Sequence, residues 1–211
     1  MKTILFDLDG TLIDSTEAIL ESFGVTYDTF GKQAPEAEEI TKLIGFPLDI
    51  MFRMLGVSMH EADAYVATYK EYYRLISRQK TTLLPLAMEA VKHASTIATL
   101  GIVTTKTARY SEELLEHFGI MRYFKVLVGR ESVTHPKPHP EPILKAVRAL
   151  MSIPEQTWMI GDTALDLIAA RDAGVHGIGV LCGYGTKYDL QQHTDLIAND
   201  TREAVKLIAR L

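Results

Sequence analysis

Two carboxylates one residue apart are the first residues in the chain whose types and spacing could do chemistry. Asp7 and Asp9 follow the short apolar run 4–6 and precede Gly10. At the end of a strand they can point the same way, where they repel each other unless a cation lies between them. Gly10 allows a sharp turn that exposes backbone N–H groups to an anion. An Asp-Gly turn with solvated acids is the alternative interpretation.

A second pair of acids follows another apolar run. Asp162 and Asp166 stand four residues apart after Gly161, just beyond the run 157–160. A strand-to-helix turn can bring both carboxylates to one side. The same acids would also stabilise a helix start through its dipole, so the pattern alone leaves both roles open.

Two hydroxyls and a lysine complete the set of candidate residues. Thr104 and Thr105 follow an apolar run and could donate to a phosphate oxygen or cap a helix. Lys137 lies in the stretch 136–142, where four of the eight prolines stand, and this stiff connector would hold it in place. Its ammonium could face an anionic group, although most lysines lie on the surface.

The elements that must position these residues follow an alternating pattern. We expect strands over 4–6, 101–103, 125–128, 157–160 and 177–180, and helices over 111–118, 142–150, 164–173 and from 202 onward. Strands that are each followed by a helix predict a mainly parallel α/β sheet with right-handed crossovers. In such a sheet the functional site lies just beyond the carboxyl ends of the strands, where the candidate residues stand.

A helical block interrupts this alternation after the first strand. Helical patterns run from Ser15, a candidate N-cap, to about residue 30, and then through 35–80. The tyrosines of 61–76 are expected to pack between helices rather than stack on bases, because no basic cluster accompanies them. We therefore predict a core over 1–15 and 82–211, with an inserted α-helical cap over 16–81.

Composition excludes several classes of protein. The chain has 211 residues, 47% of them hydrophobic, and a formal charge of −5, which excludes a disordered chain. The single cysteine, Cys182, excludes a disulfide scaffold and leads us to expect a cytoplasmic location. The acidic balance argues against a nucleic-acid partner, and we expect neither a signal peptide nor a membrane-spanning segment.

One chemistry fits the strand-end residues when they are taken together. Oxygen ligands from Asp7, Asp9 and Asp162 suit a hard cation such as Mg²⁺ beside a phosphate. Thr104 and Lys137 would then hold the other phosphoryl oxygens. The set predicts a phosphoryl-transfer site.

The order of these motifs resembles the four motifs of the haloacid dehalogenase (HAD) superfamily. They read Asp7-Leu8-Asp9-Gly10-Thr11-Leu12, Thr104, Lys137-Pro138 and Gly161-Asp162-x-x-x-Asp166, and the match covers essentially the whole chain. The helical block is similar to the C1 cap of the phosphoglycolate-phosphatase-like branch. The resemblance implies a Rossmann-like core with helices on both faces of a parallel sheet, and a mobile four-helix cap.

The same resemblance implies a role for each motif residue. Asp7 would be the nucleophile that forms an aspartyl-phosphate, and Asp9 would protonate the leaving group and later activate water. Thr104 and Lys137 would bind the phosphoryl group, and Gly10 and Thr105 are further substrate-binding candidates. Mg²⁺ would be held by Asp7, the backbone carbonyl of Asp9, and Asp162, with Asp166 in support.

The expected cap offers weaker candidates for substrate choice. The loop 43–48, which contains Gly45, resembles the cap loop that reaches into the active site of the family. Lys42 and Arg53 flank it and could meet a second anionic group on the substrate, or could be solvated helix residues. The further candidates are Arg74, His135 and His139. The seven histidines show no metal-ligand spacing, so we expect no zinc site.

Two local features depart from the family pattern. Leu84-Pro85-Leu86 stands where many relatives have a Pro-Gly turn, and the usual glycine between Val91 and Gly101 is missing. The first departure lies in the hinge segment that is expected to lead from the cap back to the core, and it could change the stiffness of that hinge. The second weakens the local match but leaves Thr104 in place.

Three activities compete within the family. The first is Mg²⁺-dependent hydrolysis of a small phosphate monoester, as in phosphoglycolate phosphatase. The alternative is an inorganic pyrophosphatase, because 101–106 and 135–142 look similar to a bacterial pyrophosphatase branch. A phosphosugar mutase fits less well, since Gly10-Thr11-Leu12 is the phosphatase-like form of the first motif, and the presence of Asp9 disfavours a dehalogenase.

An alternative outside the enzymes is a catalytically silent binding module on the same fold. It would predict the loss of Asp7, Asp9, Lys137 or Asp162, and all four are present. The expected partner is a small phosphorylated metabolite, with neither nucleic acid nor membrane, and the expected state is a monomer or a weak homodimer.

Overall fold

The computed structural model describes residues 2–211 and divides the chain into two compact units. The core unit consists of Met1–Ile13 and Leu83–Leu211, and the cap unit of Asp14–Thr82. The chain passes between them in strands β2 (Ile13–Asp14) and β3 (Thr82–Leu83), which pair with each other. Both passages lie within two residues of the boundaries that we expected from the sequence.

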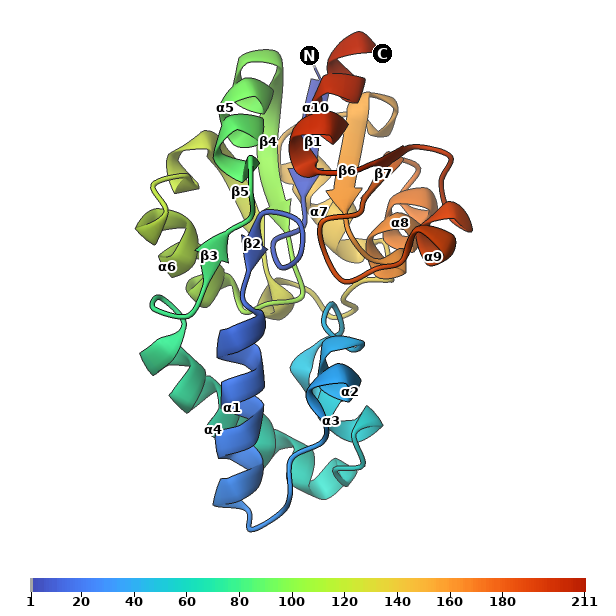
Figure 1. Cartoon of the computed structure of the whole chain (residues 1–211). Helices are drawn as coiled ribbons and strands as arrows, with labels where there is room; N and C mark the ends of the chain where they lie inside the picture. Colours follow the sequence, from blue (N-terminus) through green and yellow to red (C-terminus); the bar gives the residue numbers. More distant parts are fainter. Residues whose placement is uncertain (1) are drawn as a thin grey trace. The chain divides into compact units, whose positions relative to one another are not determined.

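A six-stranded sheet in the order β5-β4-β1-β6-β7-β8 forms the core unit (Figure 1). Its strands are β1 (Lys2–Phe6), β4 (Ala98–Val103), β5 (Phe124–Val128), β6 (Thr157–Gly161), β7 (His176–Val180) and β8 (Ile197–Ala198). All the pairings between them are parallel, as the alternating pattern predicts. After β1 the chain builds outward to β5 and then continues on the other side of β1 with β6. The strand order therefore reverses beside β1, which is where ligands bind in sheets of this kind.

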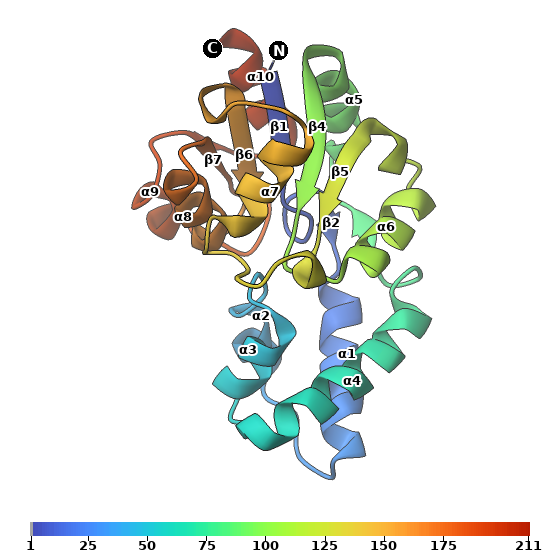
Figure 2. The same ribbon diagram turned by 180° about the vertical axis from the view of Figure 1, so that it is seen from behind.

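Alternating side chains of β1 supply two hydrophobic clusters, one on each face of the sheet. Ile4 and Phe6 belong to one cluster, whereas Leu5 belongs to the other. Helices α5 (Ala87–Ile97) and α10 (Thr201–Arg210) cover the first face. Helices α7 (Glu141–Ala149) and α8 (Ala164–Asp172) cover the second (Figures 1 and 2). This is the expected Rossmann-like core.

Shorter elements complete the core unit. Helix α6 (Ala108–His117) adds Leu114 and Leu115 to the first cluster. The remaining elements are α9 (Lys187–Gln191) and three 3₁₀ turns, η1 (Met121–Tyr123), η2 (Arg130–Ser132) and η3 (Pro154–Gln156). The sequence pattern does not predict α5, α9 or β8, and β4 begins three residues before the expected strand. Both α9 and β8 are too short to show a hydrophobic period.

Four helices form the cap unit around a cluster of aromatic rings. They are α1 (Thr16–Thr29), α2 (Ala37–Thr41), α3 (Leu48–Met54) and α4 (Met59–Ile76). The rings of Phe23 and Phe52 lie 4.6 Å apart, and Tyr65 and Tyr69 of α4 pack edge-on against Phe52. The burial of these tyrosines confirms that they pack between helices.

Two local features differ from the sequence expectation. Ser15 stands at the N-cap of α1, but its side chain makes no capping hydrogen bond. Instead Asp14 Oδ1 accepts a hydrogen bond from Thr16 N at 2.9 Å. Leu86 precedes α5 with φ of 65°, in the left-handed region that favours glycine. Leucine thus occupies a turn position that favours glycine, at a conformational cost of about 1–2 kcal/mol.

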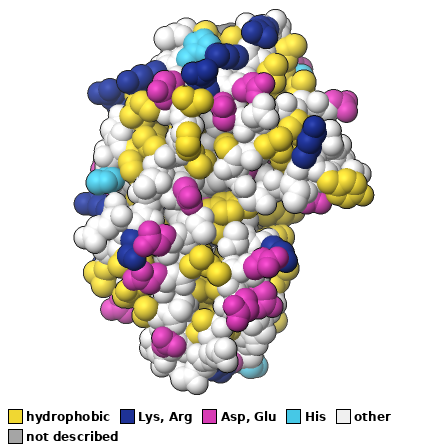
Figure 3. Space-filling view, viewed as in Figure 1, with side chains coloured by type: hydrophobic (Ala, Val, Ile, Leu, Met, Phe, Trp, Pro, Cys, Tyr) yellow, Lys and Arg dark blue, Asp and Glu magenta, His cyan; other side chains and the backbone are white. Residues whose placement is uncertain are grey.

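Charged side chains of both signs are scattered among uncharged and apolar ones on the face drawn in Figure 3. Within residues 2–211, every helix is too short or too polar to cross a bilayer.

Candidate active site

Three neighbouring strands bring the predicted residues to one edge of the sheet. Asp7, Thr104 and Asp162 directly follow β1, β4 and β6, which are parallel and adjacent. Backbone hydrogen bonds extend this pairing, since Asp7 N donates to Ile160 O and Thr104 N to Val128 O, each at 2.9 Å. The three side chains are buried, so the sheet geometry fixes them close together.

The Lys137 ammonium joins these strand ends. Its Nζ lies 2.9 Å from Asp7 Oδ1, and it donates to Asp166 Oδ1 at 2.5 Å and to Val103 O at 2.9 Å. Only 3% of Lys137 is exposed, which is rare for a lysine. Burial acts to lower its pKa, but Asp166 and Asp7 outweigh that effect and raise the pKa above its ordinary value. The ammonium therefore stays charged inside the core unit.

Asp166 ties this lysine to the start of α8. Its Oδ2 accepts hydrogen bonds from Thr163 N at 3.1 Å and from Thr163 Oγ1 at 2.8 Å, which caps the helix. Its Oδ1 accepts from Lys137. Both oxygens have protein donors, so the geometry suits the supporting position that we expected for Asp166.

Asp162 is fully buried and is held on both oxygens. Its Oδ1 accepts from Thr11 Oγ1 at 3.0 Å, and its Oδ2 accepts from Tyr184 N at 2.8 Å. Burial, reinforced by Asp7 and Asp166, nonetheless raises the pKa of Asp162 well above its ordinary value. The two hydrogen bonds therefore do not compensate the burial of this carboxylate and the neighbouring negative charges.

Asp7 shows the same excess of negative charge. Burial, with Asp166 and Asp9 adding to it and Lys137 opposing it, raises its pKa to about 7. Its buried Oδ1 accepts no hydrogen bond of good geometry from residues 2–211, although Lys137 Nζ lies 2.9 Å away.

These charges and distances fit a divalent cation. Carboxylate oxygens of Asp7, Asp162 and Asp166 lie within 4.8 Å of one another. Three ionised carboxylates against the one ammonium of Lys137 leave two negative charges, which a hard divalent cation with oxygen ligands would neutralise.

The loop after β7 closes over Asp162. A Cβ on Gly183 would lie 2.2 Å from Asp162 Oδ2 and 2.4 Å from Gly10 O, and Gly185 N donates to Asp162 O at 3.1 Å. A side chain at position 183 would therefore displace the carboxylate. The sequence analysis missed this loop, although glycines on both sides of Tyr184 after a strand were an available signal.

Gly10 closes the turn after β1, and its role toward a substrate anion stays a prediction. Its N–H donates to Ile13 O at 2.8 Å and closes the turn. Gly10 has φ of +78°, and a Cβ there would lie 2.2 Å from Asp162 Oδ2. What the site requires of Gly10 is thus the absence of a side chain.

Lys106 is a cation near the site that the sequence analysis did not single out. Its Nζ lies 3.2 Å from Asp9 Oδ2, and these side chains are only 11% and 12% exposed. Its backbone N–H donates to Thr104 Oγ1 at 3.1 Å. Thr105, between them, is partly buried. The place of Lys106 in the same strand-end loop as Thr104 could have indicated that it is a site residue.

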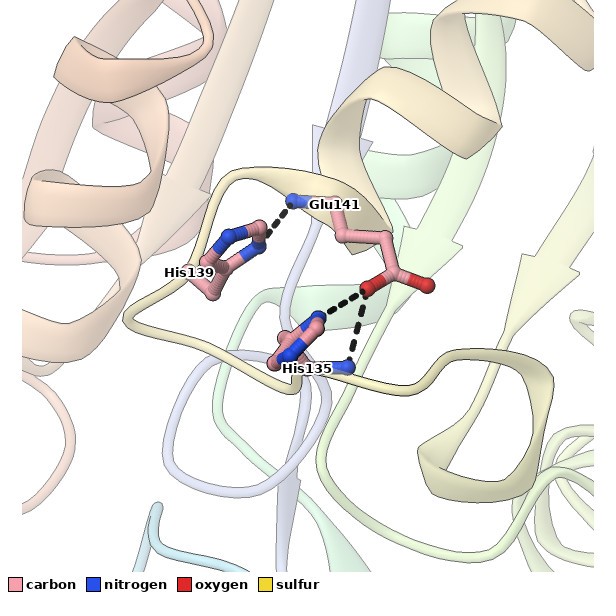
Figure 4. Close-up of side chains that lie close together, drawn as sticks. All are labelled: His135, His139 and Glu141. Atoms are coloured by element: carbon pink, nitrogen blue, oxygen red, sulfur yellow. Dashed lines mark hydrogen bonds and ion pairs between the residues drawn. The ribbon is translucent and has the colours of Figure 1, made fainter.

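A second cluster contains His135, His139 and Glu141, whose potential ligand atoms lie within 4.8 Å of one another (Figure 4). Their spacing in the sequence did not indicate this proximity, and our expectation that there is no zinc site stays a prediction. Glu141 accepts hydrogen bonds from Thr134 N and His135 N, each at 2.9 Å, and its N–H donates to His139 Nδ1 at 3.1 Å. These bonds join both sides of Lys137 and fasten its loop.

The candidate residues of the cap unit are exposed or engaged within that unit. Lys42 is 69% exposed and pairs with Glu38 at 2.7 Å, and Arg53 Nε donates to a carbonyl of its own helix at 3.3 Å. Gly45 has φ of +112°, and Arg74 is exposed on α4. Any role for them toward the core unit stays a prediction.

Comparison with known proteins decides the family. The model of the haloacid dehalogenase-like hydrolases matches residues 4–180. The chain belongs to this family.

Relatives of this HAD-like hydrolase match it along nearly its whole length. The pyrophosphatase PpaX of Oceanobacillus iheyensis is 32% identical, over 99% of this chain and 97% of its own. The pyrophosphatase PpaX of Anoxybacillus flavithermus is 32% identical over 94% and 96%. The structure of a haloacid dehalogenase-like family hydrolase from Streptococcus pneumoniae superposes with a TM-score of 0.89 at 29% identity, covering 98% of both chains. The chain is therefore an enzyme that hydrolyses phosphoric esters.

Replacing Glu141 should change how the stability of this HAD-like hydrolase depends on pH. The N–H groups of Thr134 and His135 lower the pKa of Glu141 to about 2, from an ordinary value of 4.5. Its stabilisation is complete above the ordinary value and is lost as the pH falls toward about 2. We expect Glu141→Gln to flatten the fall of Tm between about pH 5 and pH 2.5, as measured by circular dichroism.

Glu112→Gln, at an exposed glutamate of α6, is the matched control and should keep the wild-type slope. Equal slopes for the wild type and Glu141→Gln would contradict the fastening role of Glu141.

Replacing Gly183 should disable the HAD-like hydrolase without unfolding it. We expect Gly183→Ala to lower the rate of phosphate release roughly a hundredfold, because displacing a reactive group by about an ångström has effects of that size. The matched control is Gly24→Ala in α1, where an added Cβ would meet nothing within 4 Å. The control should keep its activity and gain about 0.5–1 kcal/mol of stability. Wild-type turnover in a folded Gly183→Ala variant would show that the loop does not position Asp162.

Proposed function

We propose that this enzyme is an Mg²⁺-dependent inorganic pyrophosphatase that works through an aspartyl-phosphate on Asp7. The observation that carries the chemistry is the buried group of Asp7, Lys137 and Asp162 at the strand ends. The choice of substrate is supported by the full-length relatives that are named pyrophosphatases. They favour the alternative of the sequence analysis over its first choice, a phosphoglycolate-like monoester.

The proposed cofactor suits the residues of the site. Asp7, Asp162 and the backbone carbonyl of Asp9 would hold Mg²⁺, with Asp166 in support, and the ion would offset the negative charge between carboxylates and substrate. An ionised Asp7 needs no base to act as a nucleophile.

In the first step, an oxygen of Asp7 attacks one phosphorus atom of pyrophosphate. The bond between that phosphorus and the bridging oxygen breaks, and its electron pair leaves with the oxygen. Asp9 gives a proton to this oxygen, so that the first phosphate departs. Lys137 and Thr104 bind the transferred phosphoryl group, and Thr104 Oγ1, which accepts from Lys106 N, keeps its own hydrogen for a phosphoryl oxygen.

In the second step, Asp9 acts as a base. It takes a proton from a water molecule whose oxygen attacks the phosphorus atom of the aspartyl-phosphate. The bond between phosphorus and Asp7 breaks, its electron pair returns to the carboxylate, and the second phosphate leaves. One pyrophosphate and one water thus give two phosphates, and both aspartates return to their starting states.

The remaining expectations belong to the same proposal. A small phosphorylated metabolite is the partner, without nucleic acid or membrane, and the enzyme acts as a monomer or a weak homodimer. The unpaired Cys182 supports a cytoplasmic location.

A phosphate-release assay with Mg²⁺ tests this function. We expect kcat/KM for pyrophosphate to exceed the values for phosphoglycolate, sugar phosphates and nucleotides by roughly tenfold or more. Asp7→Asn should lose about a thousandfold or more of this activity, because no covalent intermediate can form. Its far-UV circular dichroism should stay that of the wild type, since the change removes a poorly compensated buried charge.

A higher kcat/KM for any monoester would overturn the choice of pyrophosphate. Retained turnover in a folded Asp7→Asn variant would instead overturn the role of Asp7 as the nucleophile.

A further inference from the structure

We propose that Lys106 binds the leaving group and selects substrates whose leaving group is an anion. This inference deepens the proposed function and rests on it, because the role of Asp9 toward the leaving oxygen locates the place where that group departs. It adds a substrate-binding residue that lies outside the four motifs of the family.

The first observation is the position of Lys106 beside Asp9. Lys106 Nζ lies 3.2 Å from Asp9 Oδ2. In the proposed mechanism Asp9 donates its proton to the oxygen of the leaving group, so that oxygen must come within hydrogen-bond distance of the carboxyl group. An ammonium this close to Asp9 is therefore within reach of the atoms bonded to the leaving oxygen. In pyrophosphate the atom bonded to the leaving oxygen is the second phosphorus, which carries the anionic oxygens of the departing phosphate.

The second observation is that the backbone of Lys106 is fastened at both of its polar groups. Its N–H donates to Thr104 Oγ1 at 3.1 Å, and its carbonyl accepts from Arg130 N at 3.0 Å. Both neighbouring loops belong to the core unit and follow adjacent strands, β4 and β5. The side chain thus starts from a fixed point, as a group that must meet a small substrate requires.

The segment after Lys106 is also held in place. Ala108 N donates to both carboxylate oxygens of Glu131 at 3.0 Å. A Cβ on Gly129 would lie 2.5 Å from Ala108 N, so the two loops touch backbone to backbone. The lysine side chain is 11% exposed, whereas most lysines extend into water. A lysine that only extends into water would need neither these backbone hydrogen bonds nor this burial.

The third observation is that Lys137 and Lys106 contact different groups of the site. Lys137 already contacts Asp7, Asp166 and Val103 O, which places it on the side of the nucleophile. Lys106 contacts the acid on the side of the leaving group. When the bridging bond breaks, negative charge develops on the leaving oxygen, and a fixed ammonium stabilises that charge. An anionic leaving phosphate gains more from this ammonium than a neutral alcohol or phenol does.

Two substrates separate these effects. Pyrophosphate and p-nitrophenyl phosphate have leaving groups of comparable acidity, but the leaving group of pyrophosphate carries additional negative charge. We expect Lys106→Met to lower kcat/KM for pyrophosphate roughly 10- to 100-fold more than for p-nitrophenyl phosphate, and Lys106→Arg to restore most of the ratio. Lys125→Met, at an exposed lysine of β5, controls for the loss of one positive charge and should leave the ratio unchanged.

Several outcomes would overturn the inference. An equal loss on both substrates would assign Lys106 to positioning Asp9 rather than to binding the leaving group. Unchanged kcat/KM values for both substrates would exclude both roles. If Lys106→Met fails to fold, as judged by circular dichroism, Lys106→Arg and Lys106→Gln provide the same comparison.

Failure of the proposed function gives a different result. A wild-type enzyme that hydrolyses p-nitrophenyl phosphate but not pyrophosphate would refute the pyrophosphatase activity alone. Lys106 is then tested with phosphoglycolate, whose leaving group carries a carboxylate. A loss confined to phosphoglycolate would support the inference, and an equal loss on both esters would overturn it.

Discussion

The burial of three carboxylates around a single ammonium is the constraint on which the rest of the core unit depends. Burying an ionised group without compensation is costly, and one Lys137 cannot compensate Asp7, Asp162 and Asp166 together. The raised pKa values of Asp7 and Asp162 express this deficit. Protonation would relieve it but would leave Asp7 unable to attack phosphorus. A divalent cation would relieve it and keep the nucleophile ionised, which is why charge and chemistry point to the same ligand.

The architecture keeps this unfavourable cluster in place. Parallel strands deliver Asp7 and Asp162 to one edge beside β1, where the strand order reverses. Glycines at positions 10 and 183 let two loops close on Asp162 at distances that no other residue permits. The loop of Lys137 is fastened by Glu141, and Asp166 is held by the first turn of α8. The stability of the sheet and helices thus offsets the electrostatic cost of the site.

Much of this arrangement could be predicted from the sequence, because it depends on short-range patterns. The alternation of apolar runs and helical stretches predicted the parallel sheet, and the order of the motifs predicted which strand ends would meet. Lys106, Gly183 and the cluster around Glu141 could not be predicted in this way. Their positions depend on contacts between loops that are distant in sequence, such as Gly183 with Asp162. The hydrogen bond of the Gly10 N–H inside its own turn could not be predicted either, because a local motif does not show which donors the turn itself uses.

The central claim is that the buried carboxylates need a divalent cation, and thermal unfolding with and without Mg²⁺ tests it most directly. A ligand that binds only the folded state raises Tm, by roughly 2–4 °C for each kcal/mol in a chain of this size. We predict that millimolar Mg²⁺ raises the Tm of the wild type and of the surface variant Glu112→Gln, and leaves that of Asp162→Asn unchanged. No rise in the wild type, or an equal rise in Asp162→Asn, would contradict the account.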